Sequence, residues 1–133
     1  MPALHCVTGA SGYVASELVR QLLVSGQRVR GTVRKLGSSR ASQLEQMALA
    51  VGAEARLELM EADLLQPCSF RPAIQGCDFL HHVASPFVFG LGDPQTTLID
   101  PALQGTRNVL STAAEFKGSL KCVVVTSSVA GRL

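Results

Sequence analysis

The 133-residue sequence lacks long apolar runs and clusters of like charge. No stretch approaches the ~20 consecutive apolar residues that a membrane helix requires, and no basic region with a cleavage site stands at its start. The formal net charge of +2 is small, and the basic residues are scattered. These absences argue against membrane, secreted and nucleic-acid-binding proteins. We therefore expect a cytoplasmic protein whose partners are neither lipids nor nucleic acids.

The cysteines do not follow a metal-binding pattern. The four residues, Cys6, Cys68, Cys77 and Cys122, lie too far apart for ligand pairs of the Cys-x-x-Cys type. Cys6 and Cys122 fall within apolar, strand-like runs, where we expect a free thiol to behave as a small buried hydrophobic side chain. The sequence therefore indicates no metal site.

Apolar runs of strand length alternate with segments whose apolar residues have helical spacing, which is typical of βαβ units. With 47% hydrophobic and 17% charged residues, the chain can bury one core. We predict strands over residues 4–8, 28–33, 56–61, 79–83 and 122–126, and helices over 13–25, 40–51, 69–75 and 95–116, the last disturbed at Pro101. Five parallel strands joined by helices make a Rossmann-type, doubly wound α/β sheet, whose ligands bind at the carboxyl ends of the strands.

A glycine turn follows the first predicted strand, with the sequence Thr8-Gly9-Ala10-Ser11-Gly12-Tyr13-Val14-Ala15-Ser16. Gly9 permits the tight turn, Gly12 lets a phosphate approach the backbone, and Ala15 allows close packing of helix on strand. The helix N-terminus suits the pyrophosphate of a dinucleotide. Further predicted contacts of this turn are Ser11, Tyr13 and Val14. The alternative is an ordinary helix capped by Thr8 or Ser11.

Basic residues, and no acidic residue, follow the second predicted strand. Arg34 can lie against the adenine ring and pair with a 2′-phosphate, and Lys35 or Arg40 is close enough to share that charge. An acidic residue at this position would instead hold a ribose hydroxyl. The pattern favours NADP over NAD, and the alternative is a set of solvated surface cations.

The third and fourth predicted strands also end in candidate site residues. Asp63 can accept a hydrogen bond from the adenine amino group while Leu64 covers the ring, although Asp63 also fits a helix N-cap. Small residues leave the backbone accessible after the fourth strand, where ribose and nicotinamide would pass: Val83, Ala84 and Ser85. His81 and His82 are adjacent and point to opposite faces, so we expect packing roles rather than a shared catalytic or metal site.

A hydroxyl cluster, Thr126-Ser127-Ser128, comes after the fifth predicted strand. One of these hydroxyls can bond a substrate carbonyl, and the alternative is a strand end that caps the next segment of the chain. Because the cluster lies in the same crevice as the other candidate residues, we favour a role in the reaction over a purely structural one. We assign Thr126 and Ser127 to cofactor binding.

Taken in order, these motifs resemble the extended short-chain dehydrogenase/reductase superfamily, of the NAD-dependent epimerase/dehydratase type. Within it, the sequence is similar to dihydroflavonol reductases, cinnamoyl-CoA reductases and related NADPH-dependent carbonyl reductases. Besides the strand ends, the resemblance rests on Gly76-Cys77-Asp78, His82-Val83-Ala84-Ser85-Pro86, Asp100-Pro101-Ala102 and Gly105-Thr106-Arg107-Asn108-Val109-Leu110. It covers nearly the whole chain.

The resemblance implies how such a reductase would act. It gives Ser128 the role of polarising the substrate carbonyl, while the tyrosine of a Tyr-x-x-x-Lys motif donates the proton and NADPH delivers hydride. The only tyrosine here is Tyr13, and no lysine follows Ser128. We therefore expect residues 1–133 to be an incomplete NADP-binding domain, without the substrate-binding C-terminal region, from a reductase of an aldehyde, ketone or thioester carbonyl.

Two alternatives remain open. A non-catalytic NADP-binding module, such as a regulator or pseudoenzyme, agrees with the missing Tyr-x-x-x-Lys motif. A nucleotide-sugar epimerase or dehydratase, or a hydroxysteroid dehydrogenase, shares the same plan, although Arg34 and residues 82–86 argue against it. If the domain is incomplete, its fifth strand is an open edge, and we expect poor solubility or a need for a partner.

Overall fold

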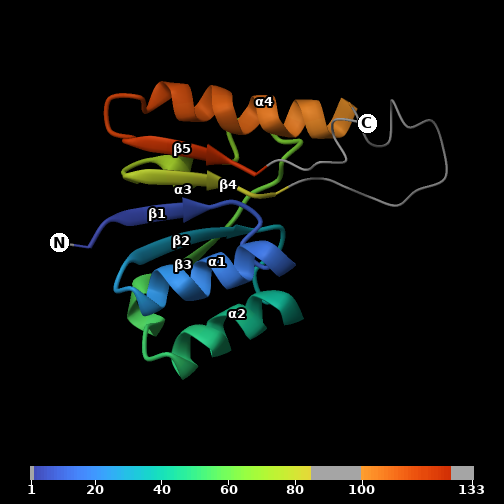
Figure 1. The fold of residues 1–133 in the computed structure, drawn as a ribbon. Helices are drawn as coiled ribbons and strands as arrows, with labels where there is room; N and C mark the ends of the chain where they lie inside the picture. The colour runs from blue at the N-terminus through green and yellow to red at the C-terminus, as the bar shows by residue number, and fades with distance from the viewer. Residues whose placement is uncertain (1, 85–99, 127–133) are drawn as a thin grey trace.

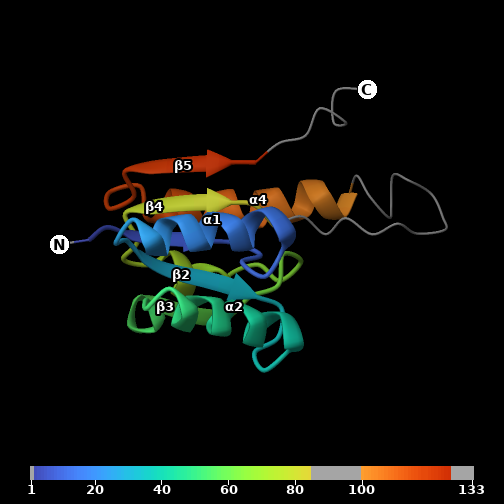
Figure 2. The same ribbon diagram turned by 60° about the horizontal axis from the view of Figure 1, so that its bottom comes forward.

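Five parallel strands form one sheet in the order β3-β2-β1-β4-β5 in the computed structural model, which describes residues 2–84 and 100–126 (Figure 1). The strands are β1 (Leu4–Val7), β2 (Arg28–Val33), β3 (Leu57–Glu61), β4 (Phe79–His82) and β5 (Cys122–Val125). The chain runs outward from β1 to β3 and then returns to β4 on the other side of β1. Strand order therefore reverses between β1 and β4, as in the predicted doubly wound sheet, and all carboxyl ends meet at one edge (Figure 2).

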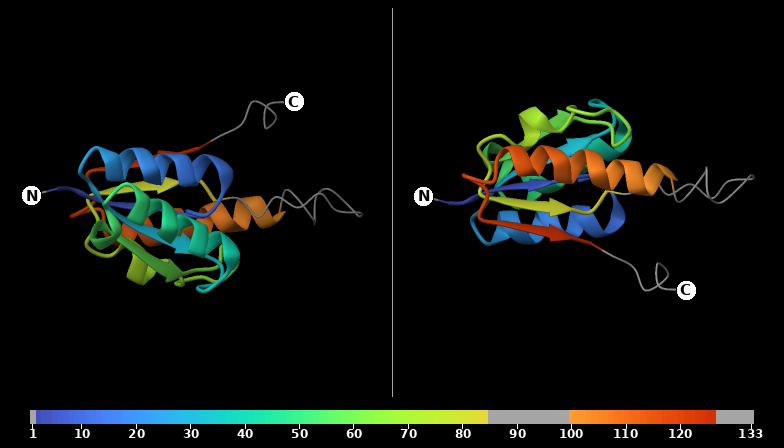
Figure 3. Two further views of the ribbon diagram at one scale, coloured as in Figure 1. Left: turned by 90° about the horizontal axis from the view of Figure 1, so that it is seen from below. Right: turned by 90° about the horizontal axis from the view of Figure 1, so that it is seen from above.

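Helices cover both faces of this sheet (Figure 3). One face carries α1 (Tyr13–Val24) and α2 (Ser39–Ala50), and the other carries α3 (Arg71–Ile74) and α4 (Asp100–Glu115). A short 3-10 helix, η1 (Glu54–Arg56), precedes β3. The arrangement is a consequence of parallel pairing, because each right-handed crossover must place its helix on one face or the other.

Two apolar cores lie on opposite faces of the sheet. Adjacent side chains of β1 belong to different cores: Cys6 lies in the core under α3 and α4, and Val7 lies in the core under α1 and α2. This alternation is the two-residue period of a strand. The largest buried side chains are Phe70, Ile74 and Leu80 in the first core, and Val19, Leu23 and Val29 in the second.

The four-residue helix α3 is too short to be stable alone and is held by a side chain from the sheet. Arg30 of β2 donates from Nη1 to three backbone carbonyls at 2.7–3.2 Å, those of Pro72, Ala73 and Gln75. One guanidinium therefore binds carbonyl groups at the C-terminal end of α3 and fixes this helix to the sheet.

The predicted helix over 69–75 is wrong at its start, because α3 begins only at Arg71. Ser69 is engaged elsewhere: its Oγ donates to the Asp63 carbonyl at 2.8 Å and accepts from the Asp63 N–H at 3.1 Å. Three predicted strands also end one residue early, since Thr8, Val83 and Thr126 lie just beyond β1, β4 and β5. Residues 95–99 of the last predicted helix lie outside the described part.

The outermost strand, β5, pairs only with β4 within the described residues. Its valines are exposed by 37% at Val123, 50% at Val124 and 46% at Val125. Cys122 is exposed as well, which corrects the expectation of a buried thiol there, because no described strand covers the outer edge of β5. Across the described residues, no helix is both long and apolar enough to span a bilayer.

Candidate functional site

The glycine turn between β1 and α1 is fixed to the neighbouring strand by Thr32. Thr32 accepts the N–H of Gly9 at its Oγ1 (3.1 Å) and the N–H of Ala10 at its carbonyl (2.8 Å). Gly9 has φ +61°, a left-handed conformation that favours glycine. A Cβ at Gly12 would lie 3.2 Å from the Gly9 carbonyl oxygen. Gly9 therefore suits the tight turn, as predicted, a side chain at Gly12 would be crowded, and the approach of a phosphate at Gly12 stays a prediction.

Close approach between β2 and this turn also requires Gly31, which the sequence analysis missed. A Cβ on Gly31 would lie 2.7 Å from the Cβ of Ala10. An isolated glycine within an apolar strand is the signal that indicates such an approach. Ala15 packs into the core under α1 and is 1% exposed, in agreement with its expected role as a small packing residue.

The N-terminus of α1 opens toward solvent without a capping side chain among the described residues. Its N-cap is Gly12, which has no side-chain oxygen, so the alternative of a helix capped by Thr8 or Ser11 is not observed. Tyr13 and Val14, at its first two positions, are exposed. The first N–H groups of a helix have no acceptor within the helix and carry its positive dipole end. They can therefore bind an anion such as a pyrophosphate.

Three exposed cations surround the loop between β2 and α2. Arg34 and Lys35 follow β2 directly, and Arg40 lies in the first turn of α2. None of the three forms an ion pair with another described residue. The structure thus places all three near one strand end, where a phosphate would neutralise them.

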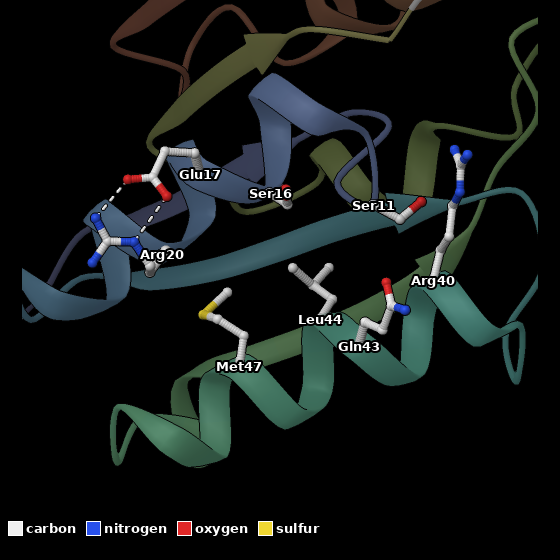
Figure 4. A pocket seen from close by; sticks show the side chains of 8 residues that line it. All are labelled: Ser11, Ser16, Glu17, Arg20, Arg40, Gln43, Leu44 and Met47. Carbon is white, nitrogen blue, oxygen red and sulfur yellow. Dashed lines mark hydrogen bonds and ion pairs between the residues drawn. The ribbon is translucent and has the colours of Figure 1, made fainter.

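A cavity of about 210 Å³ between α1 and α2 brings Ser11 and Arg40 together (Figure 4). Its other lining residues are Ser16, Glu17, Arg20, Gln43, Leu44 and Met47. Hydrogen bonds from Arg20 and then Gln21 lower the pKa of Glu17 to about 2. Because Arg20 is paired with Glu17, Arg40 is the cation of this cavity that remains for an external anion.

One acidic residue reaches the same loop from β3, and the sequence analysis missed it. Glu61 is the last residue of β3, and its Oε1 accepts the N–H of Leu36 at 2.9 Å. It thereby holds the segment that carries Arg34 and Lys35. Parallel pairing of β2 with β3, which ends in the pair Val33 and Glu61, brings the two strand ends together.

Asp63 and Leu64 lie at the adjacent strand end but have local structural contacts. Asp63 accepts the N–H of Leu65 at its Oδ1 (2.9 Å), so it stabilises a turn rather than capping α3. Leu64 packs against α4, where a Cβ on Gly105 would be 3.1 Å from its own Cβ. Asn108 donates from Nδ2 to the Leu64 carbonyl at 2.6 Å. Their adenine contacts remain predictions.

The first residues after β4 are held against the glycine turn. Val83 and Ala84 each donate their N–H to Thr8 Oγ1 at 3.0 Å. A Cβ on Gly9 would meet the Cβ of Ala84 at 2.8 Å. The structure therefore brings three predicted cofactor residues, Gly9, Val83 and Ala84, into one site.

The adjacent histidines have different surroundings, as predicted. His82 is 3% exposed and bonds through Nδ1 to Thr8 Oγ1 at 2.9 Å. His81 bonds through Nε2 to Nδ1 of His5 at 2.9 Å on the opposite face. No group of three His, Cys, Asp or Glu side chains among the described residues could hold a metal ion.

The remaining candidates lie at the end of β5 or outside the described residues. Thr126 is exposed, and its N–H donates to the His82 carbonyl at 3.0 Å, which places it at the carboxyl edge of the sheet. Ser85, Ser127 and Ser128 lie outside the described part, and their assigned roles remain predictions.

Comparison with known proteins shows the family of this chain. Residues 6–131 match the 3-beta hydroxysteroid dehydrogenase/isomerase family. The chain belongs to this family. Hydroxysteroid dehydrogenases were among the alternatives left open by the sequence, but family membership fixes fold and ancestry rather than substrate.

Relatives of this chain within the family include named plant reductases. Cinnamoyl-CoA reductase CAD2 of Medicago truncatula is 49% identical over 125 residues, which are 94% of this chain and 37% of that protein. Tetraketide alpha-pyrone reductase 1 of Arabidopsis thaliana is 45% identical over 123 residues, 92% of this chain and 37% of that protein. The chain thus spans about 37% of the length of these curated relatives.

One solved structure that this chain resembles contains NADPH, the cofactor that the sequence predicts. Gre2 of Candida albicans, in complex with NADPH, superposes with a TM-score of 0.83 at 32% identity, over 97% of this chain and 38% of that protein. Its fold therefore agrees with the five-stranded sheet described above.

Proposed function

We propose that this chain binds NADP(H) at its glycine turn and forms the cofactor-binding part of an oxidoreductase that reduces an aldehyde, ketone or thioester carbonyl. The observation that carries this proposal is the cavity that Ser11 of the glycine turn shares with Arg40, next to the uncapped N-terminus of α1; Arg34 and Lys35 lie on the same loop before α2 and are exposed. The relatives named as reductases, and the NADPH complex of Gre2, support the same conclusion. The partner is a small carbonyl compound rather than nucleic acid or membrane, and a cytoplasmic location belongs to the same proposal.

The geometry of the described residues fits this cofactor. Gly12 is the N-cap of α1 and carries no side chain, so a pyrophosphate can approach the first N–H groups of this helix. Arg34, with Lys35 and Arg40, neutralises the 2′-phosphate, and Oδ2 of Asp63 accepts from the adenine amino group. NADPH supplies hydride when bound. The residues of this chain bind and orient it.

Arg34→Asp tests the assignment. The substitution replaces a cation beside the 2′-phosphate by an anion, so we expect roughly tenfold to 100-fold weaker binding of NADPH, corresponding to one or two charge-assisted hydrogen bonds. NADH lacks the 2′-phosphate, so its affinity should change little. Calorimetric titration with both nucleotides measures the difference, with thermal unfolding as the check on folding.

Lys117→Asp is the matched control for charge. It causes the same change in net charge at an exposed position after α4, at the end of the molecule away from the strand carboxyl ends. NADPH affinity should be unchanged in this variant. Equal loss of NADPH and NADH binding in Arg34→Asp would remove Arg34 from the 2′-phosphate site, and no binding of either by the folded wild type would refute the proposal.

A further inference from the structure

The hydrogen bonds of the Thr8 hydroxyl determine where its proton lies. Thr8 Oγ1 is 3.0 Å from the backbone nitrogens of both Val83 and Ala84. Both are amide N–H groups, which can only donate. A hydroxyl group has two lone pairs and one proton. The two amides therefore occupy both lone pairs, and the hydroxyl proton remains for a third partner.

That third partner is His82, whose Nδ1 lies 2.9 Å from Thr8 Oγ1. Since the hydroxyl has only its proton left to share, Nδ1 must be an acceptor and carry no proton. His82 is therefore neutral, with its proton on Nε2. A protonated imidazole would place an N–H against the hydroxyl, and Thr8 would have to release one of the two backbone amides to accept it.

The surroundings of His82 favour this neutral form. His82 and Thr8 are 3% and 0% exposed, and burial lowers the pKa of His82. Its neighbour on β5 is Val125. On α3 and α4, which cover this face, the ionisable side chains described are Arg71, Arg107 and Glu115, and all three are exposed. On β1, Cys6 is the other titratable group of this face, and its pKa is raised, so it is neutral as well.

We infer that His82 is a positioning residue of the cofactor site. Through the Thr8 hydroxyl, its neutral imidazole holds Val83 and Ala84, which form one wall of that site, against the glycine turn. The inference rests on the proposed binding of NADP(H) at the glycine turn. Thr8 directly follows β1 and begins the turn, so its hydroxyl joins the turn to Val83 and Ala84 after β4. The closeness of Gly9 to Ala84 shows how little room this wall has to move.

Protonation of His82 therefore loosens the contact between the turn and the end of β4, and cofactor affinity should fall in acid. His82→Asn keeps an acceptor near the position of Nδ1 but cannot be protonated, so it should bind NADP+ with affinity close to wild type near pH 7.5. As the pH is lowered from about 7.5 to the lowest pH at which the protein stays folded, its affinity should fall less than that of wild type. The 2′-phosphate also titrates near pH 6, but equally for both proteins.

His81→Asn is the matched control, because His81 precedes His82 on β4 and bonds to His5 on the opposite face. Its pH dependence of NADP+ binding should equal that of wild type. Calorimetric titration with NADP+, which withstands acid, measures all three proteins. The inference is wrong if His82→Asn retains the wild-type pH dependence, or if His81→Asn removes it.

A measurement on the free wild-type protein tests the same inference without any cofactor. Nitrogen-15 NMR of the histidine rings distinguishes the two neutral tautomers and the charged form. We expect His82 to carry its proton on Nε2 near pH 7.5. A proton on Nδ1 would overturn the inference even if NADP+ binds. Failure of wild type to bind NADP+ would instead refute the proposed function, and with it the role of His82 in binding. The NMR measurement of the His82 tautomer needs no cofactor, so it would still test the hydrogen bond between His82 and Thr8.

Discussion

Replacing Gly9 by alanine should destabilise the fold by two separable effects. The first is the backbone: a left-handed conformation such as φ +61° costs an L-residue about 1–2 kcal/mol, partly offset by about 0.4–1 kcal/mol from the stiffer unfolded chain. The second is steric, because the new Cβ would lie 2.8 Å from the Cβ and 3.0 Å from the Cα of Ala84. Overpacking of this kind costs about 1–3 kcal/mol, so we expect a total loss of about 2–4 kcal/mol.

Gly52→Ala isolates the backbone effect. Gly52 has φ +70°, and a Cβ there would meet nothing within 4 Å among the described residues outside its chain neighbours. Its loss of unfolding free energy should be about 1 kcal/mol. Urea unfolding followed by circular dichroism measures both variants, and the difference between them is the steric cost.

A double variant tests whether Ala84 causes that difference. Ala84→Gly removes the nearest contacting atom, the Cβ of Ala84, so part of the steric cost should disappear when it is combined with Gly9→Ala. Equal losses for Gly9→Ala and Gly52→Ala, or no coupling between positions 9 and 84, would refute the contact between the glycine turn and the end of β4.

Two further outcomes are expected. Arg30→Met should lower the unfolding free energy by about 1–3 kcal/mol, because it leaves the carbonyls at the end of α3 without their shared donor; unchanged urea unfolding would show that α3 does not need it. Acidification should destabilise the protein through its histidines, since burial lowers the pKa of His5, His81 and His82 below the unfolded value of 6.5. Above pH 6.5 these histidines are neutral in both the folded and the unfolded protein, and below it the unfolded protein binds more protons. The free energy of unfolding, measured by urea titration, should therefore fall as the pH drops through 6.5. A constant free energy of unfolding would contradict the lowered histidine pKa values.

Much of the fold could be predicted from the sequence because strands and helices here have distinct apolar periods. The parallel sheet and its five strands follow from short apolar runs separated by helical segments, and the opposite faces of His81 and His82 follow from the two-residue period of a strand. The glycine turn was recognisable for the same reason, since Gly9 and Gly12 stand where a strand gives way to a helix. These are local patterns, readable without knowing which strands become neighbours.

Contacts between distant segments could not be predicted in this way. The pairing of Thr8 with His82 joins residues 74 positions apart and requires β1 and β4 to be adjacent. Likewise, the bond from Leu36 to Glu61 depends on the order of β2 and β3. The shorter α3 reflects competition between a helix cap and a side-chain bond, in which Ser69 binds the Asp63 backbone. Sequence periodicity carries no information about that choice.

The position of a strand within the sheet also determines how easily that strand unfolds locally. This matters for the glycine turn and for Thr126, which lie on different strands of the candidate site. β1, which carries the glycine turn, is flanked by β2 and β4, whereas β5, which carries Thr126, has one neighbour in the described part of the chain. Local opening costs least where few neighbours must be released. The proposed phosphate-binding end of the site is therefore built on a strand that is held on both sides, and the hydroxyl end on the outermost strand of the described sheet.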